Sequence, residues 1–292
     1  MKFLLTGGNG QVGYELRRTL SPLGKVIAPA RDALDLEQPD TLRAAVREFQ
    51  PKVIVNAAAY TAVDQAEGDV ERAARINSAA VEVLAEEAHK CGALLVHFST
   101  DYVFDGAKAG PYREDDAPNP LNIYGRTKLA GEEVLRARKD PHLIFRTSWV
   151  YGARGRNFLL TMRRLAQERK ELRIVDDQMG APTWARMIAE SVALAISQCR
   201  GEGGLDEACV AARSGTYHLT NRGSVSWHGF AAAILEDMKG SARLIPIPSS
   251  GYPAPAPRPR NSVLDSSKLK KVFGLGLPDW RDGLRLCLEE LE

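Results

Sequence analysis

The sequence has few cysteines, and they are not spaced for a disulfide framework or a metal site. Among its 292 residues the four cysteines, Cys91, Cys199, Cys209 and Cys287, are widely scattered and form no C-x-x-C pair. The five histidines show no H-x-x-x-H spacing either. Reduced thiols fit this pattern better than a cross-linked scaffold or a zinc site.

A long hydrophobic run and a strong net charge are also missing. No apolar stretch approaches the ~20 residues that a membrane span requires. Met1 and Lys2 lead straight into a strand pattern, with no signal-peptide cleavage region. Lys and Arg number 39 against 37 Asp and Glu, a formal net charge of +2 that does not suggest a nucleic-acid surface. We therefore expect a cytoplasmic protein that binds neither membrane nor nucleic acid.

Apolar, strand-like runs alternate with helical patterns in the first half of the chain. The runs lie at 3–5, 25–28, 52–56, 93–98 and 142–146, and the helical stretches between them include 41–49, 70–91 and 123–138. This alternation predicts an α/β fold with a Rossmann-type doubly wound parallel sheet. Right-handed crossovers would gather the strand ends at Gly7, Asn56, Thr100 and Thr147 along one edge.

Beyond about residue 151 the alternation weakens. Helices are predicted at 157–169 and 183–197, a loop at 199–214, a strand at 216–219, a helix that Ser226 opens, and a strand at 243–247. The following stretch is dense in proline up to Pro259, which precludes a helix.

A glycine-rich turn directly follows the first apolar run. The segment reads T-G-G-N-G-Q-V-G from Thr6 to Gly13 and leads into a helical pattern. Glycines at these positions allow a sharp turn, a close approach to a pyrophosphate and tight helix packing. The pattern alone also fits an ordinary turn, but its position behind the first strand favours a dinucleotide site. The residues expected there are Gly7, Gly10, Gln11, Val12 and Gly13.

A phenol and an ammonium occur four residues apart, at Tyr124 and Lys128, within a predicted helix. This spacing puts them on one helix face, where the cation would lower the pKa of the phenol toward the range useful for proton transfer. Two solvated surface residues would show the same spacing. Upstream, Thr100 follows the apolar run 93–98, at the edge where ligands meet an open α/β sheet.

These motifs, in this order, resemble the extended short-chain dehydrogenase/reductase superfamily, whose Ser/Thr, Tyr and Lys triad falls on Thr100, Tyr124 and Lys128. Further blocks at 55–64, 99–104, 146–151 and 180–183 resemble the dTDP-4-dehydrorhamnose reductase family. The resemblance implies reduction of the C4 keto group of dTDP-4-dehydro-L-rhamnose to give dTDP-L-rhamnose. Tyr124 would donate the proton, Lys128 would hold the nicotinamide ribose and lower the Tyr124 pKa, and Thr100 would bond the carbonyl.

The resemblance also implies a division of the chain. Residues 1–150 would form the dinucleotide-binding Rossmann domain. Residues 151–292 would form mainly a smaller C-terminal substrate-binding lobe, with the chain crossing back to the main domain.

The cofactor is expected to be NADPH, with NADH also permitted. Arg31 lies where a Rossmann unit accommodates the 2′-phosphate of NADP, but the adjacent Asp32 could take the free ribose hydroxyl of NAD. By resemblance, Asp35 and Leu36 contact the adenine. The stretch after the third strand would line the cofactor, through Asn56, Ala57, Ala58 and Ala59.

Substrate contacts are expected from two aromatic and two basic residues. Tyr102 and Trp149 match substrate-contacting aromatics of the family, although core packing explains Trp149 equally well. Arg258 and Arg260 end the proline-rich stretch, and their forked donors suit a pyrophosphate.

The resemblance further implies a homodimer with Mg²⁺ at the contact between the two chains. Glu15 matches one ligand position of that site, and Glu190 lies near the others. An ordinary carboxylate on a helix face is the alternative.

Two other functions remain open from the sequence. One is another extended-family enzyme, a nucleotide-sugar epimerase or dehydratase, although Thr100-Asp101-Tyr102 lacks the acidic pair typical of dehydratases. The other is a non-catalytic binding subunit, because the same fold serves as the regulatory partner of methionine adenosyltransferase.

Overall fold

A six-stranded parallel sheet forms the centre of the molecule. The computed structural model describes residues 1–238 and 242–291. The strand order is β12-β5-β4-β3-β1-β2, and all five neighbouring pairs are parallel. The strands are β1 (Lys2–Thr6), β2 (Lys25–Ile27), β3 (Val53–Asn56), β4 (Leu94–Thr100), β5 (His142–Thr147) and β12 (Gly215–His218). The order reverses between β1 and β3, which is the switch point where doubly wound sheets bind ligands.

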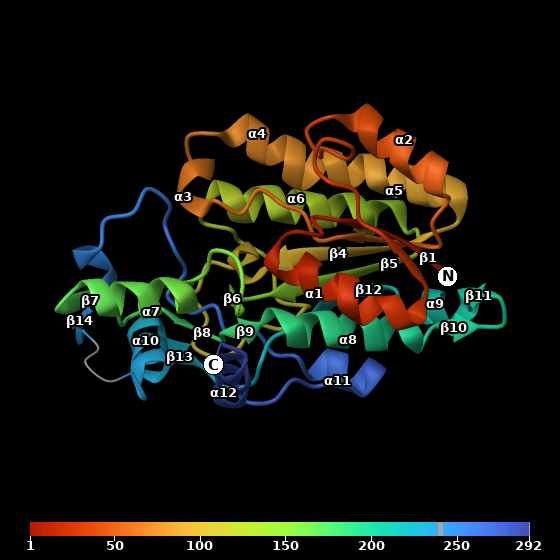
Figure 1. Cartoon of the computed structure of the whole chain (residues 1–292). Coiled ribbons are helices and arrows are strands. Elements are labelled where there is room, and N and C mark those ends of the chain that lie inside the picture. The colour runs from red at the N-terminus through yellow and green to blue at the C-terminus, as the bar shows by residue number, and fades with distance from the viewer. Residues whose placement is uncertain (239–241, 292) are drawn as a thin grey trace.

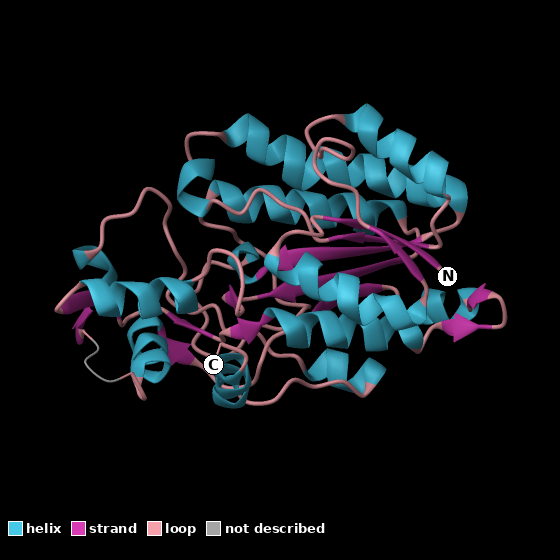
Figure 2. Ribbon diagram, viewed as in Figure 1, coloured by secondary structure: helices cyan, strands magenta, loops and turns pink. Residues whose placement is uncertain are grey.

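Helices cover both faces of this sheet, as Figures 1 and 2 show. One face carries α2 (Pro39–Phe49), α5 (Ala80–Cys91) and α6 (Ile123–Arg138), and the other carries α1 (Gln11–Leu20), α8 (Ala185–Ser197) and α11 (Ser267–Phe273). Side chains alternate along each strand, so Leu4 and Ile54 pack toward α2 and α5 while Leu5 and Val55 pack toward α1 and α8. The sheet therefore separates two apolar cores.

Three short helical pieces run on from β3 toward α5. They are α3 (Val63–Ala66), α4 (Val70–Ala74) and the π-helical turn η2 (Arg75–Ala79). The last two join α5 without a break, so the helix predicted at 70–91 is confirmed with a π-helical turn inside it.

A smaller lobe packs at one end of the molecule, at the left in Figure 1. Its elements are α7 (Phe158–Glu168), α10 (Trp227–Leu235), α12 (Trp280–Glu289), the parallel pair β7 (Glu171–Val175) and β14 (Arg243–Ile247), and the short pair β8 (Met179–Gly180) and β13 (Val225–Ser226). A separate apolar core, with Tyr151, Phe230 and Trp280 fully buried, holds it together. Pro246 is accommodated in β14 because this sheet has only two strands and β14 is at its edge.

The chain passes between the two parts more than once. It enters the lobe after β5 through the short β6 (Val150–Tyr151), returns with β9 (Thr183–Trp184), α8 and β12, and supplies α11 to the main layer later still. Residues 185–218 thus add strand β12 to the central sheet and helix α8 to its cover.

The prediction of a loop at 199–214 is wrong. The segment contains the hairpin β10 (Arg200–Gly201) and β11 (Gly204–Leu205), followed by helix α9 (Glu207–Arg213). Asp206 caps this helix by accepting a hydrogen bond from Cys209 N at 3.0 Å, and Val210 anchors it in the main core. Among the described residues, no helix combines the length and the apolar character needed to cross a membrane.

Candidate active site

The glycine turn between β1 and α1 leaves room for a ligand and would not tolerate side chains. Gly7 has a φ of +67°, and a Cβ there would lie 2.8 Å from the backbone nitrogen of Ala58. A Cβ on Gly13 would collide with the carbonyl of Gly7. Gly10 precedes α1 and has no side chain to cap it, so the first N–H groups of the helix can receive an anion.

A groove of about 190 Å³ opens beside this turn. Seven of the residues expected at a cofactor line it: Gly7, Gly10, Arg31, Asp35, Leu36, Ala58 and Ala59. Five other residues predicted at the cofactor do not line the groove, because each is engaged elsewhere. Gln11 accepts a hydrogen bond from Asn157 Nδ2 at 3.0 Å, Val12 and Ala57 pack against the main core, Gly13 backs onto Gly7, and Asn56 is engaged inside the sheet.

Arg31 lies at the rim of the groove and is already paired. Its guanidinium contacts Glu37 at 2.5 Å and Asp35 at 3.6 Å. Arg72 donates two further hydrogen bonds to Glu37, at 3.0 and 2.8 Å, and holds the pKa of that carboxyl below its usual range. Asp32 is exposed and bonds the nitrogen of Ala33, outside the groove lining.

Thr100, Tyr124 and Lys128 come together although 24 residues separate the first two in the sequence. Thr100 is the last residue of β4, and Tyr124 stands in the first turn of α6, which Asn122 caps through Gly125 N at 2.8 Å. Thr100 is close enough to Tyr124 for its hydroxyl to act on the pKa of the phenol. Lys128 follows one helical turn later and is 2% exposed.

The electrostatics of Tyr124 differ from the sequence-based expectation. Burial raises the pKa of Tyr124 to about 12, the hydrogen bond with Thr100 opposes this rise, and the nearby Asp101 adds to it. The pKa of Tyr124 is thus raised rather than lowered as predicted, and Lys128 is not among the groups that shift it. The Lys128 ammonium faces His97 Nε2 at 3.2 Å instead, and burial lowers the pKa of Lys128 to about 8.

Asp101 is a buried carboxyl that the sequence reasoning did not assign to the site. Its two oxygens accept hydrogen bonds from Thr100 Oγ1 at 2.8 Å and Ser148 Oγ at 2.9 Å. Burial raises its pKa to about 6, although hydroxyl donors including Ser262 oppose this. The sequence signal for Asp101 was its position directly after Thr100.

A row of polar side chains runs under the catalytic cluster and was also missed. Thr6, Asn56 and His97 are register neighbours on β1, β3 and β4. Thr6 Oγ1 lies 2.6 Å from Asn56 Oδ1, and Asn56 Nδ2 lies 3.1 Å from His97 Nδ1. A histidine inside the otherwise apolar run 93–98 was the signal, but a packed core histidine gives the same pattern.

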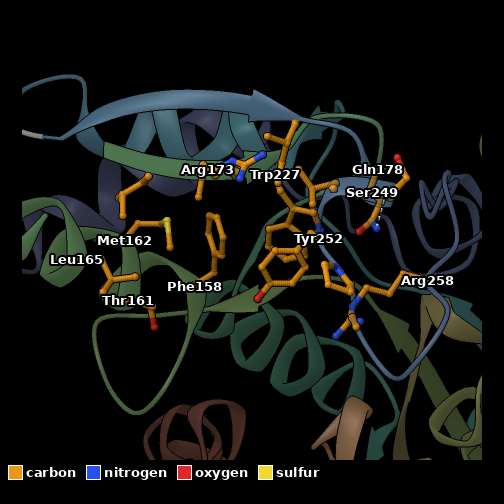
Figure 3. A pocket seen from close by; sticks show the side chains of 18 of the residues that line it. Phe158, Thr161, Met162, Leu165, Arg173, Gln178, Trp227, Ser249, Tyr252 and Arg258 are labelled. Carbon is orange, nitrogen blue, oxygen red and sulfur yellow. Dashed lines mark hydrogen bonds between the residues drawn. The ribbon is translucent and has the colours of Figure 1, made fainter. Parts of the chain in front are cut away.

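A cavity of about 1020 Å³ lies in the smaller lobe, between α7, β7 and the proline-rich segment. Figure 3 shows Phe158, Trp227 and Tyr252 along it, with Arg258 at one end and Leu165 at the other. The lining is therefore largely apolar and aromatic, with Arg258 at one end and two further arginines, Arg169 and Arg173, among the lining residues.

The predicted substrate residues occupy different places around this cavity. Arg258 lines it and pairs with Asp64 through two hydrogen bonds of 3.0 and 2.8 Å. Arg260 is exposed and does not contribute to the lining. Tyr102 meets the Tyr124 ring edge-on, with centroids 5.9 Å apart, and the nearby Arg258 charge opposes the rise that burial causes in the pKa of Tyr102.

Trp149 is stacked on Trp227, with ring centroids 3.5 Å apart, and so backs onto the cavity. Its φ of +46° is unusual for a bulky residue, and its indole fills the space where Gly180 has no Cβ.

The predicted metal residues belong to an ion-pair cluster. Glu15 contacts Arg18 at 3.2 Å and Arg186 at 3.4 Å, and Arg186 also pairs with Glu290. Burial raises the pKa of Glu190 most, and the nearby Glu15 carboxylate raises it further. Within residues 1–238 and 242–291 no group of three or more His, Cys, Asp or Glu side chains could hold a metal. Nothing here supports the Mg²⁺ prediction.

The sheet order, the glycine turn at the switch point and the Thr-Tyr-Lys cluster at the strand ends define the class. This is a doubly wound α/β reductase of the extended short-chain dehydrogenase/reductase type. The chain belongs, more particularly, to the RmlD substrate binding domain family, which matches it over residues 1–292.

Relatives support this assignment along the whole length. A dTDP-4-dehydrorhamnose reductase of Burkholderia thailandensis is 52% identical over 100% of this chain and 99% of its own. The crystal structure of such a reductase from Clostridium acetobutylicum is 35% identical, with a TM-score of 0.91 and coverage of 100% of this chain and 99% of that one. The Bacillus anthracis reductase in complex with NADP is 34% identical, with a TM-score of 0.89 and coverage of 99% of both.

Proposed function

We propose that this chain reduces the C4 keto group of dTDP-4-dehydro-L-rhamnose to dTDP-L-rhamnose, with NADPH as the reductant. The observation that carries the proposal is the packing of the first turns of α6 on β4 and on the residues that follow it, at the same sheet edge as the glycine turn. A Cβ on Gly125, next to Tyr124, would collide with the carbonyl oxygen of Tyr102, and Lys128 Nζ lies 3.2 Å from His97 Nε2. The full-length similarity to dTDP-4-dehydrorhamnose reductases supports the choice of substrate.

The reaction adds a hydride to the ketone carbon and a proton to its oxygen. The bound dinucleotide supplies the hydride. Tyr124 donates the proton, because its raised pKa keeps the phenol protonated at neutral pH. Thr100 orients the ketone oxygen beside that phenol, and Lys128 holds the nicotinamide ribose and replaces the proton that Tyr124 loses.

The residues of the groove fit a dinucleotide. Gly7 and Gly10 let the pyrophosphate approach the start of α1, and Ala58 and Ala59 line the groove with short side chains. Gln11, Val12, Gly13, Asn56 and Ala57 support this site from behind. The NADP bound to the Bacillus anthracis relative supports NADPH for this chain.

Discrimination between the two nicotinamide cofactors should be modest. A 2′-phosphate would have to compete with Glu37 and Asp35 for Arg31, which offsets part of its attraction. We therefore propose that NADPH is preferred and that NADH is also accepted.

The nucleotide half of the substrate fits the lobe cavity. Its aromatic walls, with Trp149 stacked behind Trp227, suit a thymine ring. Arg258 at the end nearest Tyr102 suits the diphosphate. This assigns residues 1–150 to cofactor binding and 151–292 mainly to substrate binding, with α8 and β12 returning to the sheet.

A coupled assay tests the proposed function. The keto-sugar is made in situ from dTDP-glucose with the upstream enzymes, and oxidation of NADPH and NADH is followed separately. We expect oxidation only when the keto-sugar is present, faster with NADPH. Tightly retained NAD without net consumption would instead indicate an epimerase. Failure across related keto-sugars, with stable binding to another protein, would indicate a regulatory subunit.

A further inference from the structure

The buried row Thr6-Asn56-His97 ends at the catalytic lysine. His97 is 0% exposed in the middle of β4, on the sheet face that α6 covers. Its Nδ1 lies 3.1 Å from Asn56 and its Nε2 lies 3.2 Å from Lys128 Nζ. In the described part of the chain, His97 supplies the one hydrogen bond recorded for Lys128 Nζ.

The chemistry of the partners restricts the protons in this row. A lysine ammonium has only donors, so His97 Nε2 must accept and the imidazole proton must be on Nδ1. That proton needs the oxygen of the Asn56 amide, whose nitrogen then faces Thr6 Oγ1. The opposite amide orientation, with Oδ1 2.6 Å from Thr6 Oγ1 and Nδ2 toward His97 as in the structure, puts the proton on Nε2 and requires an uncharged Lys128 amine. The row therefore couples the charge of Lys128 to the His97 tautomer and the Asn56 orientation.

We propose that His97 is a positioning residue of the reductase site, which holds Lys128 through Nε2 while Asn56 and Thr6 fix its tautomer. The proposal rests on the proposed function, in which Lys128 holds the ribose and resupplies Tyr124. Without this acceptor the ammonium would be buried with no hydrogen-bond partner. It would then lose its proton more easily or move away from the cofactor.

The other charges around Lys128 do not replace His97. Glu132, one turn further along α6, is occupied by Arg146 on β5 at 2.8 and 2.7 Å and by Arg136 at 3.1 Å. Tyr124, one turn earlier, remains protonated. His97 itself stays neutral, because burial and the Lys128 charge lower its pKa well below its usual range.

Two polar substitutions separate positioning from packing. In His97→Gln the longer amide can still reach Lys128, whereas in His97→Asn the shorter amide can reach Asn56 but not Lys128. Both remove the ring from the same buried place, so general loosening affects both. The pKa of Lys128 is measured by NMR of ¹³Cε-labelled lysine, with the resonance assigned by Lys128→Met, and kcat is measured in the coupled assay.

We expect His97→Asn to lower the pKa of Lys128 by about one pH unit, as for the loss of one hydrogen bond to a charged group. Its kcat should fall on the order of 10- to 100-fold. His97→Gln should keep both values close to those of the wild type. Equal effects of the two variants on both quantities, or a Lys128 pKa unchanged in His97→Asn, would overturn the proposal. If the wild type oxidises no NADPH, the proposed function fails, whereas the NMR titration still decides the role of His97.

Discussion

At the scale of single residues, burial dominates the charges of the site. Tyr124 is held protonated by its surroundings, with a pKa of about 12, which suits a proton donor. Burial instead lowers the pKa of Lys128, whose ammonium lies beside the neutral His97. Tyr124 and Lys128 lie on one helix face, yet their pKa values move in opposite directions: that of Tyr124 is raised and that of Lys128 is lowered.

Replacing Tyr124 by Phe should remove the proton donor and leave the fold intact. The exchange deletes only one hydroxyl, whose partner Thr100 retains Asp101 as an acceptor. We expect kcat to fall about 100- to 10,000-fold, the contribution of a general acid. Reduction at a near wild-type rate in a variant with an unchanged circular dichroism spectrum would disprove this role.

Replacing Lys128 by Met should stabilise the protein while it disables the enzyme. The Lys128 pKa falls from 10.5 to about 8 on folding, so the buried charge costs about 3 kcal/mol at neutral pH. Between pH 8 and 10.5 the folded chain has lost this proton and the unfolded chain still binds it, so wild-type stability rises with pH. The advantage of Lys128→Met in urea unfolding should therefore be full below pH 8 and vanish near pH 10.5. A destabilised variant at pH 7 would contradict this.

At the scale of elements, the proline-rich segment after β14 is held over the site by polar contacts. Asp64, near the start of α3, binds Arg258 and the nitrogen of Ala256, and Asn122 at the start of α6 binds the carbonyl of Pro257 at 2.8 Å. The only helical structure described in this segment is one 3₁₀ turn, η4 (Ser249–Gly251). Its conformation thus depends on residues far away in the sequence.

The two arginines of this segment should differ in their effect on substrate affinity. Arg258→Ala removes a guanidinium that lines the cavity, and we expect KM for the nucleotide-sugar to rise about 10- to 100-fold, as for a lost hydrogen bond to a charged group. Arg260→Ala changes an exposed side chain outside the lining and should move KM far less. Equal rises in steady-state assays of the two variants would show that the segment rearranges when substrate binds.

At the scale of the whole molecule, one ion-pair cluster joins the lobe to the main layer. Arg186 on α8 bridges Glu15 on α1 and Glu290 at the end of α12. A cation of the chain itself thus pairs with Glu15, the carboxylate that the family resemblance matched to a Mg²⁺ ligand position.

Added Mg²⁺ or a chelator should leave the thermal stability of the wild type unchanged. Arg186→Met would remove the cation near Glu15, Glu190 and Glu290, whose negative charges would then repel one another. We expect the unfolding free energy to fall by about 2 kcal/mol. Millimolar Mg²⁺ should then restore part of that loss in a melting experiment. A wild-type melting temperature that rises with Mg²⁺ would show that a metal displaces Arg186.

The sequence by itself determined the elements and their order, because hydrophobic period, caps and glycine turns are local properties. The helix at 123–138 and the strand at 243–247 were predicted with their observed bounds. The hairpin and helix inside 199–214 were missed because the segment has no clear hydrophobic period and the helix depends on the burial of Val210 in the main core, although its Asp206 cap is local.

Only the tertiary structure decided how the site is charged and supported. Strand register brought Thr6, Asn56 and His97 into one row, and helix packing turned Lys128 toward that row. The packing of the proline-rich segment also placed Arg258 and not Arg260 in the cavity lining, and the packing of α8 on α1 paired Arg186 with Glu15. These outcomes depend on contacts between residues distant in the chain and on the desolvation of each group, and neither quantity can be read from local sequence.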